Sequence, residues 1–468
     1  MGSTNLHDPP PTPTAAAAAV SGADMISDLH DDLLLRILSF LPAASDVART
    51  TVLSRRWRHL WHNAVALRFA IGDRPDILDD TEYRPRGASI CSNIATPAHV
   101  TAWLRFAERR VTGSFKLAVP TLTGHEMDAL LPPAHERKRY AELPASSRAE
   151  ALSLSLGYAS VTVPAAGAGA FSALGDLHLG HAQIEPGGAD ERNLGRLLSG
   201  LSAAACPRLR RLRLQHIAGL DALRLDAAGT LEELRLDDLR KLALLELDAP
   251  GLRALRVAGC YDMLSDGAAA RISAPRLETL ACATMCRPDS LRFHGAASVR
   301  AMEEIELLSH APGERWNAGA VGLLRLCTAA DSLKLSISPY EKFRLVMPGI
   351  EEMMSHLPKL RNITNLTIDV GKGFWHQPKA TMAGLIAKCS LVECLCIDIT
   401  NAENSCLRPG CMCKQEDDPM ISLEHLREAK FTGFRRSSEF HKSLVQLIIS
   451  SAPALERMTI VELIQAHI

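Results

Sequence analysis

Leucine recurs in pairs through the middle of the chain, with one residue between the two members of each pair. The pairs begin at Leu212, Leu223, Leu234 and Leu245, and a Leu-x-Val pair begins at Leu255, so the steps are 11, 11, 11 and 10 residues. A strand, a helix and two turns do not fit into 11 residues, but one short strand and one turn do. The pattern therefore predicts a regular succession of short strands over residues 209–257.

Every second pair belongs to a longer pattern, L-x-x-L-x-L, which starts at Leu209, Leu231 and Leu252. The full repeat is thus 22 and then 21 residues long, within the range of about 20–29 residues of leucine-rich repeats. We expect an α/β repeat fold, a solenoid of parallel strands whose middle coils have a strand on both faces. The first leucine of each pair should point into one core. The residues expected to point outward are Arg213, Arg224, Arg235 and Glu246.

The spacing of the strand candidates lengthens after about residue 300. Their first residues are 28, 33, 29, 34 and 29 positions apart, enough for a helix in each repeat, and are Ile305, Leu333, Leu366, Leu395, Ala429 and Met458. Apolar residues at helical spacing predict helices over 350–357, 382–388 and 444–450. The coils should therefore change from strand–strand to strand–helix toward the C-terminus. Upstream, similar patterns predict a helix over 98–110 and strands over 152–156 and 177–179.

Three short segments with one apolar face lie close together between residues 24 and 64. In the first, Leu34, Ile37, Leu38 and Leu41 follow the spacing of a helix, which Pro42 ends. About forty residues are too few to build a core alone, and two Trp side chains one turn apart indicate that a partner helix completes the apolar surface. The second segment carries Val47, Val52 and Leu53, and the third carries Trp57, Leu60, Trp61 and Ala64.

This stretch resembles the plant form of an F-box. The matching pieces are Leu33-Leu34, the run from Ile37 to Pro42, the block from Val52 to Trp57, and Leu60-Trp61. The resemblance implies docking to a Skp-family adaptor and, through it, to the cullin of a cullin–RING ubiquitin ligase. The family usually has Leu-Pro before the first helix, whereas this chain has Leu29-His30. The residues assigned to adaptor binding are Leu29, Leu33, Leu34, Ile37, Leu38, Leu41, Pro42, Val52, Leu53, Trp57, Leu60 and Trp61.

The C-terminal run carries a second resemblance. Leu426 to Phe431, Gly433, Leu444-Val445 and Ala454 to Met458 look like the FBD segment of plant F-box proteins. The chain as a whole is similar to plant F-box/leucine-rich-repeat proteins of the FBD type. This implies an F-box at 24–64, a leucine-rich-repeat solenoid at 65–421 and an FBD-like C-terminal repeat at 422–468. Residues 1–23, rich in Pro, Thr and Ala, are expected to form a disordered tail.

Composition and charge narrow the classes of function. The chain has 468 residues, of which 47% are hydrophobic and only 4% aromatic, so the core must be mainly aliphatic. Its net charge of −1, from 52 basic and 53 acidic residues, gives no global attraction to nucleic acid or to a membrane. No apolar run approaches a membrane span, and the first 23 residues do not read as a secretory signal. The twelve Cys show no disulfide framework, which favours a reducing cytoplasmic or nuclear compartment.

Several residues are candidates for chemistry. Cys406, Cys411 and Cys413 form C-x4-C-x-C in a loop; they are either three zinc ligands or reduced loop thiols. His178, His181 and His216 are similarly either a zinc triad or ordinary strand residues. The paired acids Asp237-Asp238 and Glu303-Glu304 are expected to be solvated turn residues. No nucleophile with a nearby base is evident, so we expect neither an enzyme nor a cofactor.

The function that this pattern predicts is the substrate-recognition subunit of an SCF-type ubiquitin ligase. The F-box would dock the adaptor, and the repeats would bind an unidentified target protein. Two alternatives remain at this point: a small-ligand or hormone receptor built on the same array, and a scaffold without ligase contact. A ligand pocket needs convergent basic or aromatic side chains, and 5 Trp, 5 Tyr and 11 Phe in 468 residues supply few aromatic ones.

Overall fold

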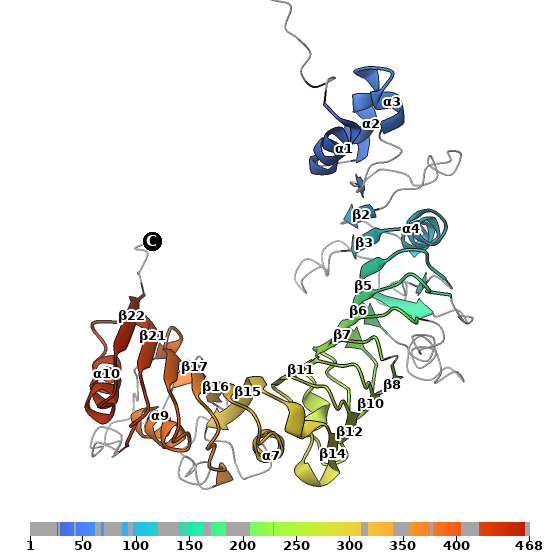
Figure 1. Cartoon of the computed structure of the whole chain (residues 1–468). Coiled ribbons are helices and arrows are strands. Elements are labelled where there is room, and N and C mark those ends of the chain that lie inside the picture. The colour runs from blue at the N-terminus through green and yellow to red at the C-terminus, as the bar shows by residue number, and fades with distance from the viewer. Residues whose placement is uncertain are drawn as a thin grey trace, which may run out of the picture.

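The molecule is a small helical unit followed by one long curved array of parallel strands (Figure 1). The computed structural model describes residues 26, 29–41, 44–60, 67–69, 87–91, 97–119, 140–143, 146–162, 170–183, 206–227, 229–309, 317–339, 356–371, 373–374, 378–403 and 421–463. In Figure 1 the array follows an arc, with its main sheet on the inner side and its helices on the outer side.

The helical unit contains α1 (Asp31–Phe40), α2 (Ala44–Arg49), the 3-10 helix η1 (Thr50–Val52) and α3 (Trp57–Leu60). Asp31 and Asp32 lie in the first turn of α1, where carboxylates interact favourably with the positive end of the helix dipole. Leu34 and Leu38, one turn apart, are buried on the inner face of α1. Helices therefore form where the three apolar segments predict them.

In the part of the chain that the structure describes, the main sheet has sixteen strands, and every pairing within it is parallel. Its path is β1-β2-β3-β5-β6-β7-β9-β11-β13-β15-β16-β17-β19-β21-β22, with β4 (Tyr140–Glu142) beside the end of β5. The strands on this path are β1 (Leu67–Phe69), β2 (Gly87–Cys91), β3 (Ser114–Val119), β5 (Ala151–Thr162), β6 (Asp176–Gln183), β7 (Arg211–Ala218), β9 (Glu233–Asp237), β11 (Ala254–Ala258), β13 (Thr279–Cys282), β15 (Ala301–Ser309), β16 (Ser332–Pro339), β17 (Asn365–Val370), β19 (Cys394–Asp398), β21 (Glu428–Phe434) and β22 (Arg457–Glu462).

A second sheet of four parallel strands covers the outer side of the middle coils (Figure 1). Its strands are β8 (Ala222–Asp226), β10 (Leu244–Asp248), β12 (Ala269–Ser273) and β14 (Leu291–His294). They alternate along the chain with strands of the main sheet, which confirms the predicted strand–strand coils. The coils continue beyond residue 257, where the sequence pattern stops, because Ala270, Ile272 and Cys282 replace leucine at buried strand positions.

Toward the C-terminus, helices replace the outer strands. The helices α7 (Ala318–Leu326), α9 (Pro378–Ala387) and α10 (Glu439–Ser451) each connect two main-sheet strands. α9 and α10 overlap the helices predicted over 382–388 and 444–450, whereas α7 lies outside every predicted range. The helix expected over 350–357 lies outside the described residues except at its last two positions. Upstream, α4 (Pro97–Arg110) confirms the helix predicted over 98–110. Two further short strands, β18 (Gly373–Phe374) and β20 (Ala402–Glu403), form a separate pair.

The core of the array is a continuous column of aliphatic side chains. Parallel register places Leu212, Leu234 and Leu255 side by side in the main sheet, and Leu223 beside Leu245 in the second sheet. All five leucines are buried, as the pair pattern predicts. Burying one such side chain contributes about 1.5–3 kcal/mol relative to leaving it exposed, so the two sheets are held together chiefly by this column.

One histidine is buried inside the last described coils. His441 lies on α10 between Phe434 and Phe440, with ring centroids at 5.8 and 5.6 Å, and its Nδ1 accepts a hydrogen bond from the backbone N–H of Arg435 at 2.9 Å. Burial, reinforced by the charge of Arg435, lowers the pKa of His441 from 6.5 to about 4. The imidazole is therefore neutral at pH 7, and it resists protonation in the folded state.

We expect Leu234→Ala to destabilise the array by about 2–5 kcal/mol, because it leaves a cavity in the column. The adjacent Arg235→Ala should change the unfolding free energy by no more than about 1 kcal/mol, since its ion pair is half-exposed. Urea unfolding followed by circular dichroism measures both. Equal effects of the two substitutions would contradict the assignment of inward and outward positions.

Acid should destabilise the C-terminal coils through His441. The folded pKa lies below the unfolded value of 6.5, so the unfolded state binds more protons and stability falls as pH falls from about 6.5 toward 4. The stability advantage of the wild type over His441→Leu should shrink by about 2 kcal/mol between pH 7 and 4.5. Thermal unfolding at both pH values tests this. A difference in stability between wild type and His441→Leu that stays constant from pH 7 to 4.5 would refute the assignment.

Candidate functional site: the exposed helices and the inner face of the array

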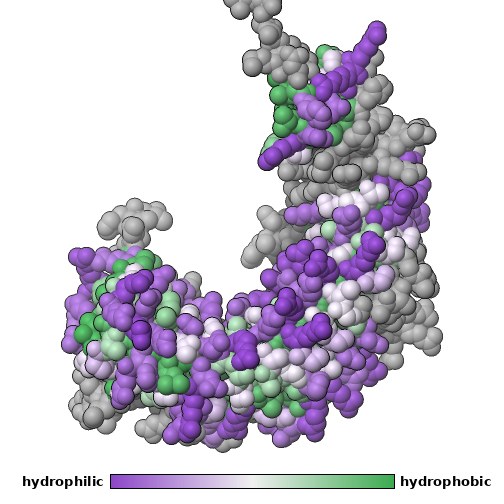
Figure 2. All heavy atoms as spheres, viewed as in Figure 1, coloured by the Kyte–Doolittle hydropathy of each residue, from purple (hydrophilic) through white to green (hydrophobic). Residues whose placement is uncertain are grey.

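A group of large apolar side chains faces solvent on the helical unit. Leu33, Ile37 and Phe40 on α1, with Val52 and Leu53 at the end of η1, are between 40% and 83% exposed. Figure 2 shows hydrophobic surface on this unit, in contrast to the largely hydrophilic inner side of the array. Exposed apolar groups of this size in so small a unit are typical of a protein-docking surface.

The structure divides the residues expected to bind an adaptor into two sets. Leu34, Leu38, Trp57 and Leu60 are at most 5% exposed and lie in the interior of the helical unit. In the chain without a partner, the apolar surface of these four side chains is therefore covered by other residues, and their assignment to adaptor binding stays a prediction. Leu29 and Leu41 are partly buried against the same cluster. Pro42 and Trp61 lie outside the described residues.

Arg56 fixes the start of α1, a role that the sequence did not reveal. Its Nη2 donates to the carbonyl oxygen of Leu29 at 2.6 Å, and its Nε donates to Asp31 Oδ1 at 2.8 Å. These charge-assisted bonds connect the segment before α3 to the first turn of α1. The positions of the exposed side chains on α1 and η1 therefore depend on this arginine.

His30 is the N-cap of α1. Its φ of −63° and ψ of 148° are extended, and this φ is the value that a proline ring imposes. The imidazole is exposed, with its Nδ1 3.5 Å from Asp32 Oδ2. The backbone at this position thus already has the geometry of the proline that plant F-boxes usually carry there.

The inner face of the array carries a row of basic and polar side chains that crosses the strands. Parallel register aligns Lys116, Ser153, His178, Arg213, Arg235 and Arg256 on six neighbouring strands. Residues at equivalent positions of parallel strands point to the same side of the sheet, so the row follows from the repeat itself. The outward direction predicted for Arg213 and Arg235 is confirmed.

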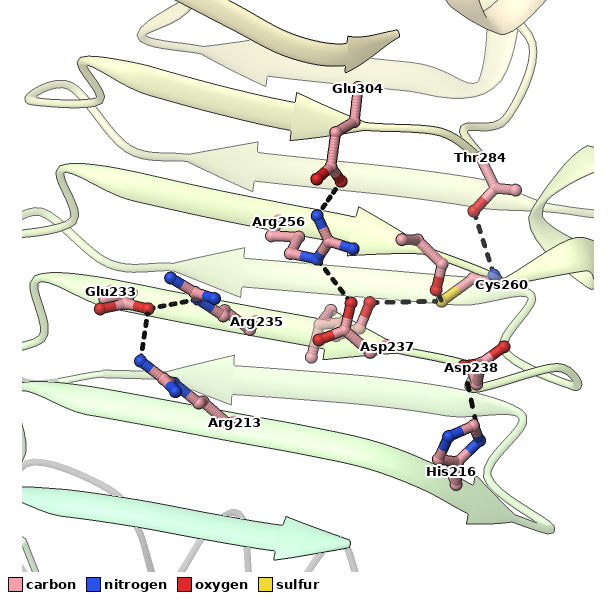
Figure 3. Close-up of polar contacts among 12 residues, drawn as sticks. Arg213, His216, Glu233, Arg235, Asp237, Asp238, Arg256, Cys260, Thr284 and Glu304 are labelled. Carbon is pink, nitrogen blue, oxygen red and sulfur yellow. Dashed lines mark hydrogen bonds and ion pairs between the residues drawn. The ribbon is translucent and has the colours of Figure 1, made fainter. Parts of the chain in front are cut away.

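Acidic residues from neighbouring positions neutralise much of this row (Figure 3). Glu233 pairs with Arg235 and, at 3.2 Å, with Arg213. Arg256 Nε lies 2.6 Å from Asp237 Oδ1, and its Nη1 pairs with Glu304. Asp237 and Glu304 are therefore ion-paired, not simply solvated turn acids, and Arg256 is a network residue that the sequence did not identify.

A second row of residues, within or directly after β6, β7, β9, β11 and β15, has left-handed backbone. His181, His216, Asp238 and Glu304 have φ between 50° and 55°, and Gly259 has φ 67°. Non-glycine residues in this conformation are strained and concentrate at functional positions. The rings of His181 and His216 stack at 4.7 Å, and His216 Nδ1 lies 3.4 Å from Asp238 Oδ2. Burial is the main cause that lowers the pKa of His181, so this imidazole is neutral at pH 7.

The described residues support no metal centre or reactive thiol. Within them, no group of three or more His, Cys, Asp or Glu side chains is arranged to hold a metal ion, which removes the support for a zinc triad of His178, His181 and His216. Cys406, Cys411 and Cys413 lie outside the described residues. Burial raises the pKa of Cys260 and Cys327 to about 12, so both stay protonated as core residues.

In the described part of the chain, no helix is long and apolar enough to cross a membrane.

Comparison with known proteins identifies the helical unit. Residues 26–65 match the F-box domain family. The chain carries an F-box domain. It is similar to a putative FBD-associated F-box protein of Arabidopsis thaliana, with 68% identity over 38 residues, or 8% of this chain and 9% of the relative. An F-box/LRR-repeat protein of the same plant is 41% identical over 104 residues, or 19% of this chain and 21% of the relative.

A putative F-box/LRR-repeat protein of Arabidopsis thaliana is 37% identical over 112 residues, which is 23% of this chain and 22% of that protein. These matches confirm the resemblance to plant F-box/leucine-rich-repeat and FBD proteins over parts of the chain. They span at most about a fifth of the relatives' length, so the similarity does not extend to what those proteins do as a whole. Beyond the F-box, the long all-parallel sheet of short strands is consistent with a leucine-rich-repeat solenoid.

The left-handed row should be sensitive to added side chains. A Cβ at position 259 would lie 2.5 Å from Asp238 Oδ1 and 3.1 Å from Asp238 Cα, on backbone with φ 67°. We expect Gly259→Ala to destabilise the array by about 1–3 kcal/mol. Gly267, which has no atom within 4 Å of a built Cβ, is the matched control, and its Ala variant should stay within about 0.5 kcal/mol. Indistinguishable melting temperatures of Gly259→Ala and Gly267→Ala would contradict the inference that the backbone of the left-handed row is constrained.

Proposed function

We propose that this chain is the substrate-recognition subunit of an SCF-type cullin–RING ubiquitin ligase. The observation that carries the proposal is the exposed apolar surface of the F-box domain, formed by Leu33, Ile37, Phe40, Val52 and Leu53. A Skp-family adaptor would cover this surface and connect the chain to a cullin. Burying these side chains supplies the hydrophobic contribution that typically anchors a helix-in-groove interface.

Leu34, Leu38, Trp57 and Leu60 support adaptor binding indirectly in this account. They form the core of the helical unit that carries the exposed side chains. Arg56 fixes the start of α1 by its hydrogen bond to the carbonyl oxygen of Leu29. Substitution of Trp57 would therefore unfold the F-box, whereas substitution of Leu53 would weaken docking with the fold intact. Binding measurements need a folding control for this reason.

The array would present a target protein to the ligase. We assign residues 1–23 to an N-terminal tail, 24–64 to the F-box, 65–421 to the solenoid and 422–468 to an FBD-like C-terminal repeat. A rigid parallel sheet holds its inner face in a fixed relation to the ligase, which raises the effective concentration of a target lysine near the ubiquitin thioester without a catalytic residue in this chain. The complex would act in the cytoplasm or the nucleus, the compartments that the cysteine pattern predicts.

The paired substitution Val52→Asp/Leu53→Asp should abolish adaptor binding. Each side chain is more than 60% exposed, so the fold tolerates the change, but a charge would face the apolar groove of the adaptor. We expect at least about a 30-fold loss of affinity, equivalent to about 2 kcal/mol, in isothermal titration calorimetry with a plant Skp-family adaptor.

The control is Ile449→Asp on α10, an aliphatic side chain that is 47% exposed and remote from the F-box. It should leave adaptor affinity unchanged. Unchanged binding by the F-box variant, with circular dichroism showing both variants folded, would overturn the proposed interface.

The variant His30→Pro should bind the adaptor at least as tightly as the wild type. The backbone at position 30 has φ −63°, so proline introduces no strain and reduces the conformational entropy of the unfolded chain, a stabilisation of about 0.4–1 kcal/mol. Thermal unfolding and calorimetry of the two forms measure both effects. A clear loss of affinity would show that the imidazole itself contacts the adaptor.

A further inference from the structure

A trough of about 880 Å³ crosses the outer face of the four-stranded sheet. Its lining residues come from β14, β12, β10 and β8, strands that lie on the outer side of the coils, opposite the main sheet (Figure 1). No helix packs over this sheet among the described residues, whereas helices lie on the outer side of the C-terminal coils. The trough thus belongs to the strand–strand coils alone, and it is independent of the F-box surface.

The strand register builds the trough from three parallel rows. One wall is the row Arg224, Glu246, Arg271 and Arg292, and the other is the row Asp226, Asp248, Ser273 and His294. Between the walls lie Leu225, Leu247 and Ile272, which are buried, and Phe293, which is partly buried against the core. Residues two apart on a strand share a face, so both walls stand on the outer surface.

The charges of the walls are only partly compensated within the chain. Glu246 pairs with Arg224 at 2.9 Å and with Arg271 at 3.2 Å, although both arginines stay more than 70% exposed. Among the described residues, the guanidinium of Arg292 donates to two backbone carbonyl oxygens, those of Asp289 and Leu291, each at 3.3 Å, and forms no ion pair.

Asp226 and Asp248 lie directly opposite each other on β8 and β10. Both are exposed, and neither forms an ion pair within the described chain. Like charges in facing positions of neighbouring strands are destabilising. The trough therefore has an anionic end over β8 and β10 and a cationic end over β12 and β14, where Arg271 and Arg292 face Ser273 and His294.

We propose that this trough docks an extended peptide segment of a partner protein, with acidic side chains at one end and basic side chains at the other. The acidic end would lie at Arg271 and Arg292, and the basic end at Asp248 and Asp226. Three strand spacings separate β14 from β8, or about 14 Å, which an extended chain spans in about four residues. A polyanion such as nucleic acid fits poorly, because its phosphates would also meet the two aspartates.

The probe is a fluorescein-labelled peptide, Glu-Glu-Ser-Ser-Ser-Lys-Lys, titrated with the full chain at low ionic strength and followed by anisotropy. Its control, Lys-Glu-Ser-Ser-Ser-Lys-Glu, has the same composition but nearly neutral ends. We expect the first peptide to bind at least about fivefold more tightly, and 0.5 M salt to abolish the difference.

Variants assign the binding to the two ends of the trough. Asp226→Asn/Asp248→Asn and, separately, Arg292→Gln should each reduce binding of the first peptide to the level of its control. Asp262→Asn/Asp331→Asn, which removes two exposed carboxylates elsewhere, should leave it unchanged. Equal affinity of the two peptides, tighter binding of an all-glutamate peptide, or equal losses in all variants would overturn the proposal, whether or not the chain binds an adaptor.

Discussion

The register of the parallel strands is the constraint on which the rest of the molecule depends. Each coil donates backbone hydrogen bonds to the coil before it, for example from the N–H of Glu232 to the carbonyl oxygen of Arg210 and from the N–H of Arg253 to that of Glu232. The same register stacks Leu212, Leu234 and Leu255 in one buried column. A one-residue slip would move every leucine to a solvent-facing position, so the outward residues are fixed as firmly as the core.

This constraint turns single outward residues into rows. On the inner face it aligns Arg213, Arg235 and Arg256, and on the outer sheet it aligns Arg224, Glu246 and Arg271. Because the core does not depend on these side chains, the two faces can carry unrelated charge patterns. The surface of the F-box differs from both faces of the array because it is apolar. An apolar surface suits binding to one unvarying partner, whereas charged rows suit discrimination between partners.

The periodicity of leucine was sufficient to predict the strand–strand repeat, because Leu-x-Leu at steps of 11 residues leaves room only for a short strand and a turn. It missed β12 and β13, where Ala270, Ile272 and Cys282 occupy buried positions instead of leucine, and β14, where Phe293 follows Leu291 in place of a second leucine. Motif resemblance located the F-box, but it does not separate interior residues such as Trp57 from surface residues such as Leu53, since both are apolar. The ion pairs of Arg256 and the left-handed row depend on cross-strand geometry, which no local pattern encodes.

In the proposed complex, the F-box alone contacts the adaptor, and the array stays accessible to other partners. Amide hydrogen exchange of the full chain, with and without a Skp-family adaptor, tests it most directly. We expect added protection confined to α1, η1 and α3, with unchanged exchange in β7 to β15. Protection spread over those strands, or none in the F-box helices while the complex forms, would contradict it.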